Sequence, residues 1–520
     1  MFFLSFALHS ALIAAPDAIK GLITGNSNEV IASAELLSEQ PPESLAVWIG
    51  AFNDFPSPDT TGWAIELKHV INDTLTAPAW LYIPTSYSPK EPTPLVISLH
   101  GGVSGAKFRD ASTKNWHEDT VFQLAEKNGW LVLFPLGMTG CAWWDKTGME
   151  NILWYIREIK RQYNIDDDRV AMCGFSDGAS GSYHFGMLAP TDFAVFFPWS
   201  GHPSVGTEVS GIQTYLENLR NRPLFASNGG KDQLYPTEIV EPSHRLMFKA
   251  GVPLSVSYCD TAGHNSGYMP NEWSKMADRF ARHPRDSYKA DLTFTTADID
   301  FNHIDWLQIN ALDTLRDSSS WYFDLNLKET DDRISIGFNN DPEYKGKGIR
   351  VAGVSRDPES PAVKAGMQPG DIVIQVDDVK IVGMPDIVKA KEGRKRGDTI
   401  TLTFKRGSKK HKVETFYPPV RVFDVYPRRY KSGSVRALHV GNKFEIESMR
   451  VSSVKLLLSR DLIRFEQPVN VVIVQGGQTK EVHNSVVVPD SKVMLNNFIQ
   501  SHDRKRLVFA EIDVEIPVVF

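Results

Sequence analysis

The stretch "AMCGFSDGASG", residues 171–181, places Ser176 between two glycines. The preceding "DDRVAMCGF" passes from charged to apolar residues, which predicts a short buried strand. Tyr183, Phe185 and Leu188 follow at a spacing compatible with a helix. A sharp strand-to-helix turn exposes a serine hydroxyl, and flanking glycines avoid the clashes that the turn would otherwise cause. Ser176 is therefore a candidate nucleophile.

The motif alone is weak, because a serine flanked by glycines at this spacing arises by chance in roughly one chain in five of this size. The alternative interpretation is a small residue in a tight turn. Partner residues in the right order along the chain decide between the two. A hydrolytic serine needs a base, a carboxylate that orients the base, and backbone donors for the oxyanion.

Length and composition bound the class of protein. The chain has 520 residues, which predicts two to four domains. Its 42% hydrophobic and 23% charged residues are typical of globular proteins, and a net charge of −7 gives no general attraction to nucleic acid. Cys173 is expected to be a buried small residue. Whether Cys141 and Cys259 pair is left open by the sequence.

Residue patterns divide the chain into segments. Short apolar strands alternate with helical stretches such as 147–163 and 237–249, which predicts a largely parallel sheet covered on both faces. After about residue 285 strand patterns dominate, and residues 420–520 are expected to form a small β-sandwich. The predicted segments are helical at 16–61, strand–helix at 62–285, β-rich at 286–331, a compact unit at 332–415 and a β-rich domain at 416–520.

Candidate partners of Ser176 follow it in the order carboxylate, then histidine. Asp232 lies in the loop "GGKDQLYP" and His264 in the loop "AGHNSG", each just past a predicted strand. The alternative for Asp232 is a turn or helix cap. Asp260 is a rival carboxylate, but it is close to His264 along the chain. His202 is a further candidate for the pocket wall, but it precedes Asp232 and breaks the order.

A glycine-rich turn precedes Ser176 in the chain. The strand "VISLHGG" ends at Gly101 and Gly102, where backbone N–H groups can approach a substrate oxygen. The predicted oxyanion hole therefore combines the N–H near Gly102 with that of Asp177, the residue after the serine. A plain glycine turn is the alternative.

These quoted stretches together resemble the α/β-hydrolase superfamily over residues 62–285. Within it they are similar to carboxylesterases grouped with polyhydroxybutyrate depolymerases, feruloyl esterases and dienelactone-hydrolase-like proteins. The resemblance implies a Ser176–Asp232–His264 triad that requires neither a metal nor an organic cofactor. One departure is Ala179, where many members have a further glycine.

Aromatic residues near the expected mouth of the site point to the acyl group. The rings of Trp143, Trp144 and Trp199 are able to pack on an aromatic or sugar-linked ester, and packing in the core or in a lid is an equally strong alternative.

A second specific stretch, "SPAVKAGMQPGDIVIQVDD", resembles a PDZ domain of the bacterial type. The preceding "KGKGIRV" is similar to a carboxylate-binding loop, so Gly348, Ile349 and Arg350 are predicted to hold a peptide C-terminus beside "IRVAGV". The alternative is a groove filled by neighbouring strands, with a purely structural module. The basic run 389–412 alternates with apolar residues, which favours a solvated strand pair over a nucleic-acid site.

The first fifteen residues, "MFFLSFALHSALIAA", are almost wholly apolar and predict a signal peptide with small residues at Ala14 and Ala15. No Lys or Arg precedes the run, so a buried helix is the alternative. No later stretch has the pattern of a membrane span. We expect an exported protein, periplasmic or secreted, without a transmembrane anchor.

The sequence therefore predicts an exported serine carboxylic-ester hydrolase with a peptide-docking module. Two alternatives remain, a serine peptidase of the same fold and a catalytically idle binding scaffold.

Overall fold

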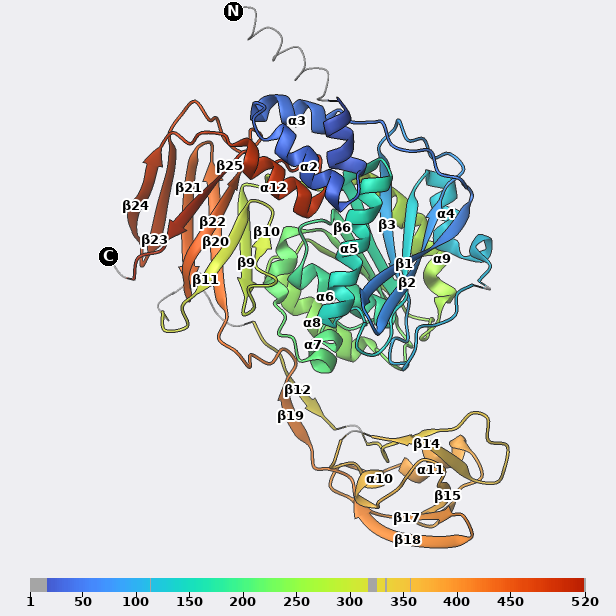
Figure 1. The fold of residues 1–520 in the computed structure, drawn as a ribbon. Helices are drawn as coiled ribbons and strands as arrows, with labels where there is room; N and C mark the ends of the chain where they lie inside the picture. Colours follow the sequence, from blue (N-terminus) through green and yellow to red (C-terminus); the bar gives the residue numbers. More distant parts are fainter. Residues whose placement is uncertain (1–15, 113, 317–324, 333, 356, 519–520) are drawn as a thin grey trace, which may run out of the picture. The chain divides into compact units, whose positions relative to one another are not determined.

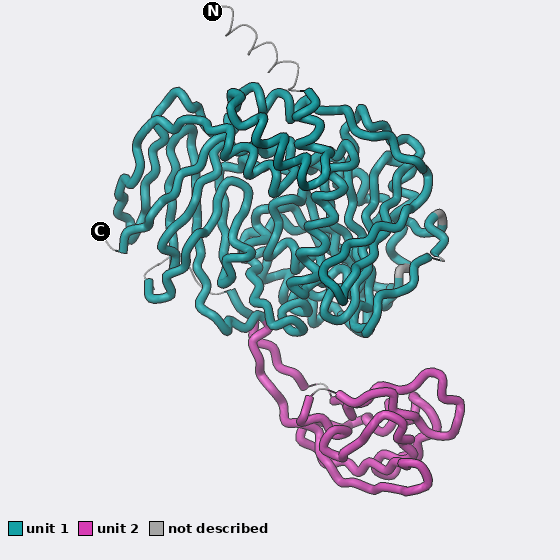
Figure 2. Tube along the Cα trace, viewed as in Figure 1, with its two compact units in different colours: residues 1–326, 426–520 teal, residues 327–425 magenta. Residues whose placement is uncertain are grey.

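The computed structural model describes residues 16–112, 114–316, 325–332, 334–355 and 357–518, and they divide into two compact units (Figure 2). One unit combines residues 1–326 with 426–520, and the other is residues 327–425. The second unit is therefore an insertion into the first. Asn326 and Tyr426, at its two ends, are joined by a 3.0 Å hydrogen bond from the Tyr426 N–H to the Asn326 side chain.

An eight-stranded sheet forms the centre of the larger unit. Counted from one edge of the sheet, the first strand is antiparallel to the second and the second to the third, and the third to eighth strands are parallel to one another. In spatial order the strands are β1 (Trp63–Asn72), β2 (Leu75–Ile83), β4 (Leu131–Pro135), β3 (Thr93–Leu99), β5 (Ile165–Phe175), β6 (Val195–Trp199), β7 (Leu224–Gly229) and β8 (Leu254–Cys259). This is the α/β-hydrolase sheet, so the predicted fold class is confirmed.

Helices cover both faces of this sheet (Figure 1). Two of them, α4 and α9, pack together on one face through a shared apolar core, and α5, α6 and α8 cover the other. Their bounds are α4 (Thr120–Asn128), α5 (Lys146–Gln162), α6 (Asp177–Leu188), α7 (Val205–Ser210), α8 (Thr237–Lys249) and α9 (Met269–Arg282), with short 3₁₀ turns η1 (Trp116–Glu118), η2 (Leu216–Asn221) and η3 (Ser266–Tyr268). Because both faces are covered, β6 is buried at every residue.

Two further sheets in the larger unit share one apolar core. The first holds β24 (Gln478–Ser485), β23 (Val469–Gln475), β21 (Lys443–Met449), β20 (Gly433–Val440) and β9 (Asp291–Thr296). The second holds β10 (His303–Ile304), β11 (Leu307–Leu312), β22 (Val451–Leu458) and β25 (Ala510–Glu515). Strands from both sides of the insertion therefore complete one β-sandwich, which extends beyond the 420–520 segment that the sequence predicts.

The N-terminal helices belong to the same core. Helices α2 (Ser27–Leu37) and α3 (Pro42–Gly50) lie against α12 (Ser491–Ser501), so an N-terminal and a C-terminal segment of the chain are neighbours (Figure 1). A capping box starts α2, with Asn26 and Glu29 satisfying each other's backbone N–H groups. Leu22, Leu45 and Phe498 are among the buried residues of this contact.

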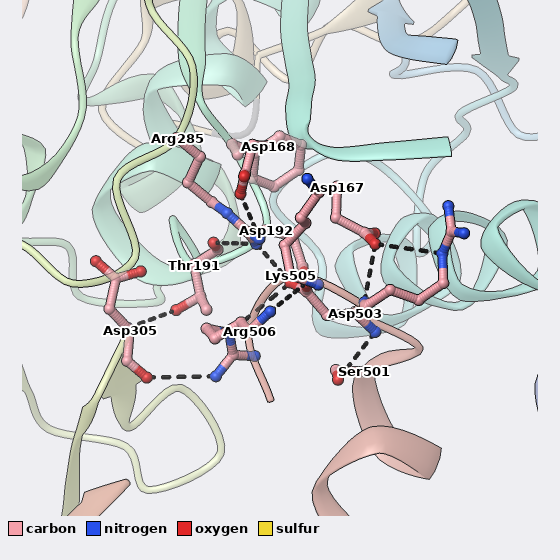
Figure 3. Close-up of polar contacts among 12 residues, drawn as sticks. Asp167, Asp168, Thr191, Asp192, Arg285, Asp305, Ser501, Asp503, Lys505 and Arg506 are labelled. Carbon is pink, nitrogen blue, oxygen red and sulfur yellow. Dashed lines mark hydrogen bonds and ion pairs between the residues drawn. The ribbon is translucent and has the colours of Figure 1, made fainter. Parts of the chain in front are cut away.

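Buried and half-buried charged residues connect the sandwich to the α/β region (Figure 3). Arg285, which follows α9, pairs with Asp503 at 2.6 Å and with Asp168 at 3.1 Å. The backbone N–H of Arg504 donates to Asp167 at 2.9 Å. These five residues, called the Asp503 cluster below, join the start of β5 to the segment after α12.

The inserted unit is a small β-sheet domain with two short helices. Its main sheet runs β13 (Phe338–Asn340), β14 (Ile349–Val354), β15 (Ile372–Val376), β17 (Thr399–Arg406) and β18 (Lys409–Phe416), with β16 (Val379–Lys380) paired to β15. Helices α10 (Pro361–Lys364) and α11 (Met384–Lys391) complete its core. A two-stranded ribbon of β12 (Lys328–Asp331) and β19 (Arg421–Asp424) begins and ends the unit.

The predicted signal peptide, residues 1–15, lies outside the described residues. Among the helices that the structure describes, none has the length and apolar character needed to cross a membrane.

Candidate active site

Ser176 lies at the turn between β5 and α6, where the sequence predicts it. Its φ of 61° and ψ of −123° form a strained conformation for a residue with a side chain. Both flanking glycines are required by close backbone approach. A Cβ on Gly174 would lie 2.3 Å from the Gly178 backbone, and one on Gly178 would lie 2.0 Å from the carbonyl oxygen of Leu99. The strand, the turn and α6 therefore fit together only with glycine at both positions.

The three residues predicted to act together are joined by hydrogen bonds. Nε2 of His264 lies 3.0 Å from Oγ of Ser176, and Nδ1 of His264 lies 2.9 Å from Oδ2 of Asp232. The Asp232 side chain is wholly buried, while that of His264 is 18% exposed. The histidine thus faces an ionisable partner in the interior and a hydroxyl at the accessible side.

The loop after β7 fixes the Asp232 carboxylate. Its Oδ1 accepts the backbone N–H groups of Leu234 at 2.9 Å and Tyr235 at 2.8 Å, which leaves Oδ2 for His264. The rival Asp260 is exposed at the surface and is not the partner of Nδ1. Asp232 is therefore the carboxylate that can orient the imidazole.

The loop after β3, residues 100–103 and called the oxyanion loop below, lies directly against the serine. A Cβ on Gly101 would lie 2.8 Å from the Cβ of Ser176, and Gly102 has a φ of +69°. In the described part of the chain, neither the N–H of Gly102 nor that of Asp177 has a protein acceptor. Both are therefore available to a substrate oxygen, as the prediction requires.

The side chain of His100 is hydrogen-bonded to the backbone of this loop. Burial lowers the pKa of its imidazole to about 4, so the ring is neutral near pH 7. Its Nε2 accepts the backbone N–H of Gly137 at 3.1 Å, which leaves the proton on Nδ1. Nδ1 then donates to the carbonyl oxygen of Gly101 at 2.9 Å.

Two aromatic rings beside His264 were not among the predicted site residues. The ring centroid of Phe175 lies 5.0 Å from the imidazole, and that of Tyr235 lies 5.7 Å from it. Burial, together with the carboxylates of Asp177 and Asp232, raises the pKa of Tyr235 to about 12 and keeps its hydroxyl neutral. Their positions next to Ser176 and in "DQLY" were the available sequence signals.

The tryptophans expected at the mouth are core residues. Trp143 and Trp199 are each 1% exposed, and Trp144 is 5% exposed. Trp143 donates its indole N–H to the carbonyl oxygen of His100 at 2.9 Å, and Trp199 packs against Trp273. They pack in the core, so of the two alternatives for these rings the structure supports core packing.

Other candidates also have structural surroundings. His202 is buried, and it lies 2.8 Å from the Ser204 hydroxyl through Nδ1, with a pKa lowered to about 4 by burial. Cys141 and Cys259, whose pairing the sequence leaves open, are both free, and Cys173 is buried as expected.

In the inserted unit, the strand predicted to receive a peptide is not at an edge. Strand β14 pairs with β13 on one side and with β15 on the other. Arg350 accepts the N–H of Asp341 on its carbonyl oxygen, and its guanidinium pairs with the Asp341 carboxylate at 2.6 Å. Strand β14 therefore has a neighbour on each side, so the expected addition of a peptide strand beside "IRVAGV" is corrected. That Gly348, Ile349 and Arg350 hold a terminal carboxylate stays a prediction. The edge strands of this sheet are β13 and β18, and β13 is the one that lies next to β14.

Comparison with known proteins agrees with the division of the chain into a larger unit and an inserted unit at 327–425. A family model described as "PDZ domain" matches residues 329–416. Residues 329–416 form a PDZ domain. The chain is 31% identical over 164 residues to a bifunctional acetylxylan esterase/xylanase of Neocallimastix patriciarum, which covers 31% of this chain and 22% of that protein. It is 38% identical over 112 residues to a probable CtpA-like serine protease of Staphylococcus epidermidis, which covers 21% and 22%. The matches span about a fifth of each relative's length.

Solved structures similar to the chain include a thermostable esterase and a ferulic acid esterase. The first is 19% identical with a TM-score of 0.33, and covers 43% of this chain and 63% of that one. The second is 15% identical with a TM-score of 0.35, and covers 43% and 99%.

Proposed function

We propose that the larger unit is a serine carboxylic-ester hydrolase. The observation that carries the proposal is the hydrogen-bonded chain from Asp232 through His264 to Ser176 at the strained turn after β5. This geometry matches the requirements of a nucleophile, a base and an orienting carboxylate. The similarity to an acetylxylan esterase favours an ester over an amide as the substrate.

The proposed reaction proceeds through an acyl-enzyme. Oγ of Ser176 attacks the ester carbonyl carbon while Nε2 of His264 takes the hydroxyl proton. The resulting oxyanion accepts hydrogen bonds from the N–H groups of Gly102 and Asp177. The imidazolium then gives its proton to the leaving alcohol, and Asp232, which stays ionised, stabilises the positive ring. Water repeats the sequence to release the acid.

We further propose that the PDZ domain binds a peptide C-terminus at the edge strand β13. A peptide added there would extend the sheet through main-chain hydrogen bonds. The Ser355 N–H donates to the carbonyl oxygen of Gly337, so the next residue, Phe338, directs its own backbone groups to the open edge. An exported location, inferred from residues 1–15, is part of the same proposal.

Serine peptidase activity is the second candidate, supported by the similarity to a probable serine protease. A hydrolysis screen distinguishes the two. Purified protein and its Ser176→Ala variant are compared on nitrophenyl esters, feruloyl esters and peptide anilides. The proposal predicts ester turnover that the variant loses by roughly 10⁴-fold. Faster cleavage of anilides than of every ester would support the peptidase instead. Absence of all turnover would support an idle scaffold.

A further inference from the structure

Two side chains outside the triad hold the oxyanion loop in addition to His100. Nη2 of Arg109 donates to the carbonyl oxygens of both Gly101 and Gly102, the latter at 2.9 Å. Oδ2 of Asp177 accepts the backbone N–H of Val103 at 2.9 Å. Arg109 is exposed and eight residues downstream of Gly101, whereas Asp177 begins α6. Two consecutive peptide groups are thus bound by side chains from different parts of the chain.

Because a peptide group is planar, a contact to its carbonyl oxygen also sets the direction of its N–H. In a trans peptide the N–H points opposite to the C=O. Arg109 binds the carbonyl oxygen of Gly101, so the N–H of Gly102 points away from the guanidinium. Adjacent glycines have wide intrinsic backbone freedom, and besides Arg109 the ring of His100 restrains the Gly101 carbonyl oxygen. Asp177 then fixes the next peptide group through Val103, which stops the loop from rotating about Gly102.

We propose that Arg109 and Asp177 are positioning residues that preset the oxyanion hole, an inference that rests on the proposed hydrolase function. Asp177 contributes one oxyanion donor through its backbone and anchors the loop that carries the other through its side chain. The two donors are therefore held at a fixed separation. Preorganised donors need no rearrangement as charge develops on the substrate oxygen, which is the source of their effect on rate.

Each residue has a competing role that the test must separate. An exposed arginine at the site can instead bind an anionic substrate, which would affect KM. A carboxylate at the first turn of a helix can instead stabilise the helix through its charge. The conservative variant Asp177→Asn removes the charge and keeps a carbonyl oxygen that can accept the Val103 N–H, so it distinguishes a hydrogen-bond role from a charge role.

The experiment measures kcat and KM on a nitrophenyl ester and the rate at which a fluorophosphonate labels Ser176. The variants are Arg109→Ala, Arg109→Lys, Asp177→Ala and Asp177→Asn in the full chain, with native thermal unfolding required of each. Lys107→Ala and Asp260→Asn are matched controls, because each removes an exposed charge from a loop beside the site. Removal of a whole oxyanion donor costs about 10²–10³ in kcat, so loss of its positioning is expected to cost ~10–100-fold.

We expect Arg109→Ala and Asp177→Ala to lower kcat and the labelling rate together, with KM nearly unchanged. Asp177→Asn should recover most of the loss, Arg109→Lys part of it, and both controls should match wild type. The inference is overturned if Asp177→Asn is as slow as Asp177→Ala, if Arg109→Ala changes only KM, or if all variants match wild type. A wild-type protein that labels but hydrolyses no ester contradicts the proposed function alone, because the phosphonyl oxygen still reports on the hole. A wild-type protein that does neither contradicts both.

Discussion

Among single residues, Gly178 lies where α6 approaches β3 so closely that no side chain fits. A Cβ there would lie 2.0 Å from the Leu99 carbonyl oxygen, a backbone atom that cannot move without the strand. We predict that Gly178→Ala destabilises the protein by roughly 1–3 kcal/mol or more and abolishes activity, because the turn that carries Ser176 is displaced. Denaturant unfolding measures the first effect. Gly50→Ala, where no atom lies within 4 Å, is the control and should leave stability near wild type.

Some single residues of the site can be predicted from the sequence and others cannot. Ser176, Asp232 and His264 were predictable because their chemistry and their order along the chain are both constrained. The positions of Trp143 and Trp199 were left open, because proximity to a strand end in the sequence does not say whether a ring faces the site or the core. Apolar area decides that question in the folded chain, and both rings are buried.

At the level of strands and helices, the PDZ domain shows that the sequence of a strand does not predict which strands pair with it. The β14 segment "IRVAGV" has the β-branched pattern of a strand, whereas β13 is only the three residues "FNN". The peptide-binding prediction rested on the similarity of "KGKGIRV" to a carboxylate-binding loop, and that stretch leads into β14. Which strand lies at the edge depends on sheet order, which local patterns do not encode.

Peptide binding at β13 can be tested through its outward backbone group. Phe338→Pro removes the N–H that faces the open edge, and we expect it to weaken binding of C-terminal peptides by at least tenfold. Titration of a fluorescent peptide selected from a C-terminal library provides the affinity. Lys345→Ala, on the exposed loop before β14, is the control. Unchanged affinity in a folded Phe338→Pro variant would place the ligand elsewhere.

For the whole molecule, the two residues that flank the insertion, Asn326 and Tyr426, are hydrogen-bonded to each other. Tyr426 is anchored in the larger unit by a 2.9 Å hydrogen bond to Ser243, and its N–H bonds to Asn326. The chain ends left by removal of 327–425 therefore lie close together. We predict that replacing this segment with a short Gly/Ser linker retains hydrolysis of small esters within about threefold, because closing a short flexible loop costs little. Collapse of activity in a soluble deletion variant would instead make the PDZ domain a structural part of the hydrolase.

The Asp503 cluster makes a prediction for pH. Burial opposes ionisation of Asp503, but the charges of Arg285 and Lys160 outweigh it and hold the pKa of this carboxyl well below its usual range. A carboxyl with a depressed folded pKa stabilises the protein at pH values above its unfolded pKa of about 3.9, and this contribution is lost as the pH falls below that value.

Asp503→Asn should therefore destabilise the protein by about 3–5 kcal/mol at pH 7, where a buried pair is broken, and by less below about pH 4. Urea unfolding of both proteins across this range checks the prediction. Glu466→Gln, which removes a 73% exposed carboxylate 3.7 Å from Arg460, is the control and should have little effect at any pH. A difference between wild type and Asp503→Asn that does not shrink on acidification would contradict this account of the cluster.

The central claim is that Ser176 is an acylated nucleophile, and direct trapping of the acyl-enzyme tests it. Wild-type protein is mixed with a nitrophenyl ester, quenched in acid within the first turnovers, and digested for mass spectrometry. We predict one acyl group on the peptide that contains Ser176, with a matching burst of nitrophenol, and neither in the Ser176→Ala variant. Acylation of a different residue, or a burst of equal size in the variant, would contradict the claim.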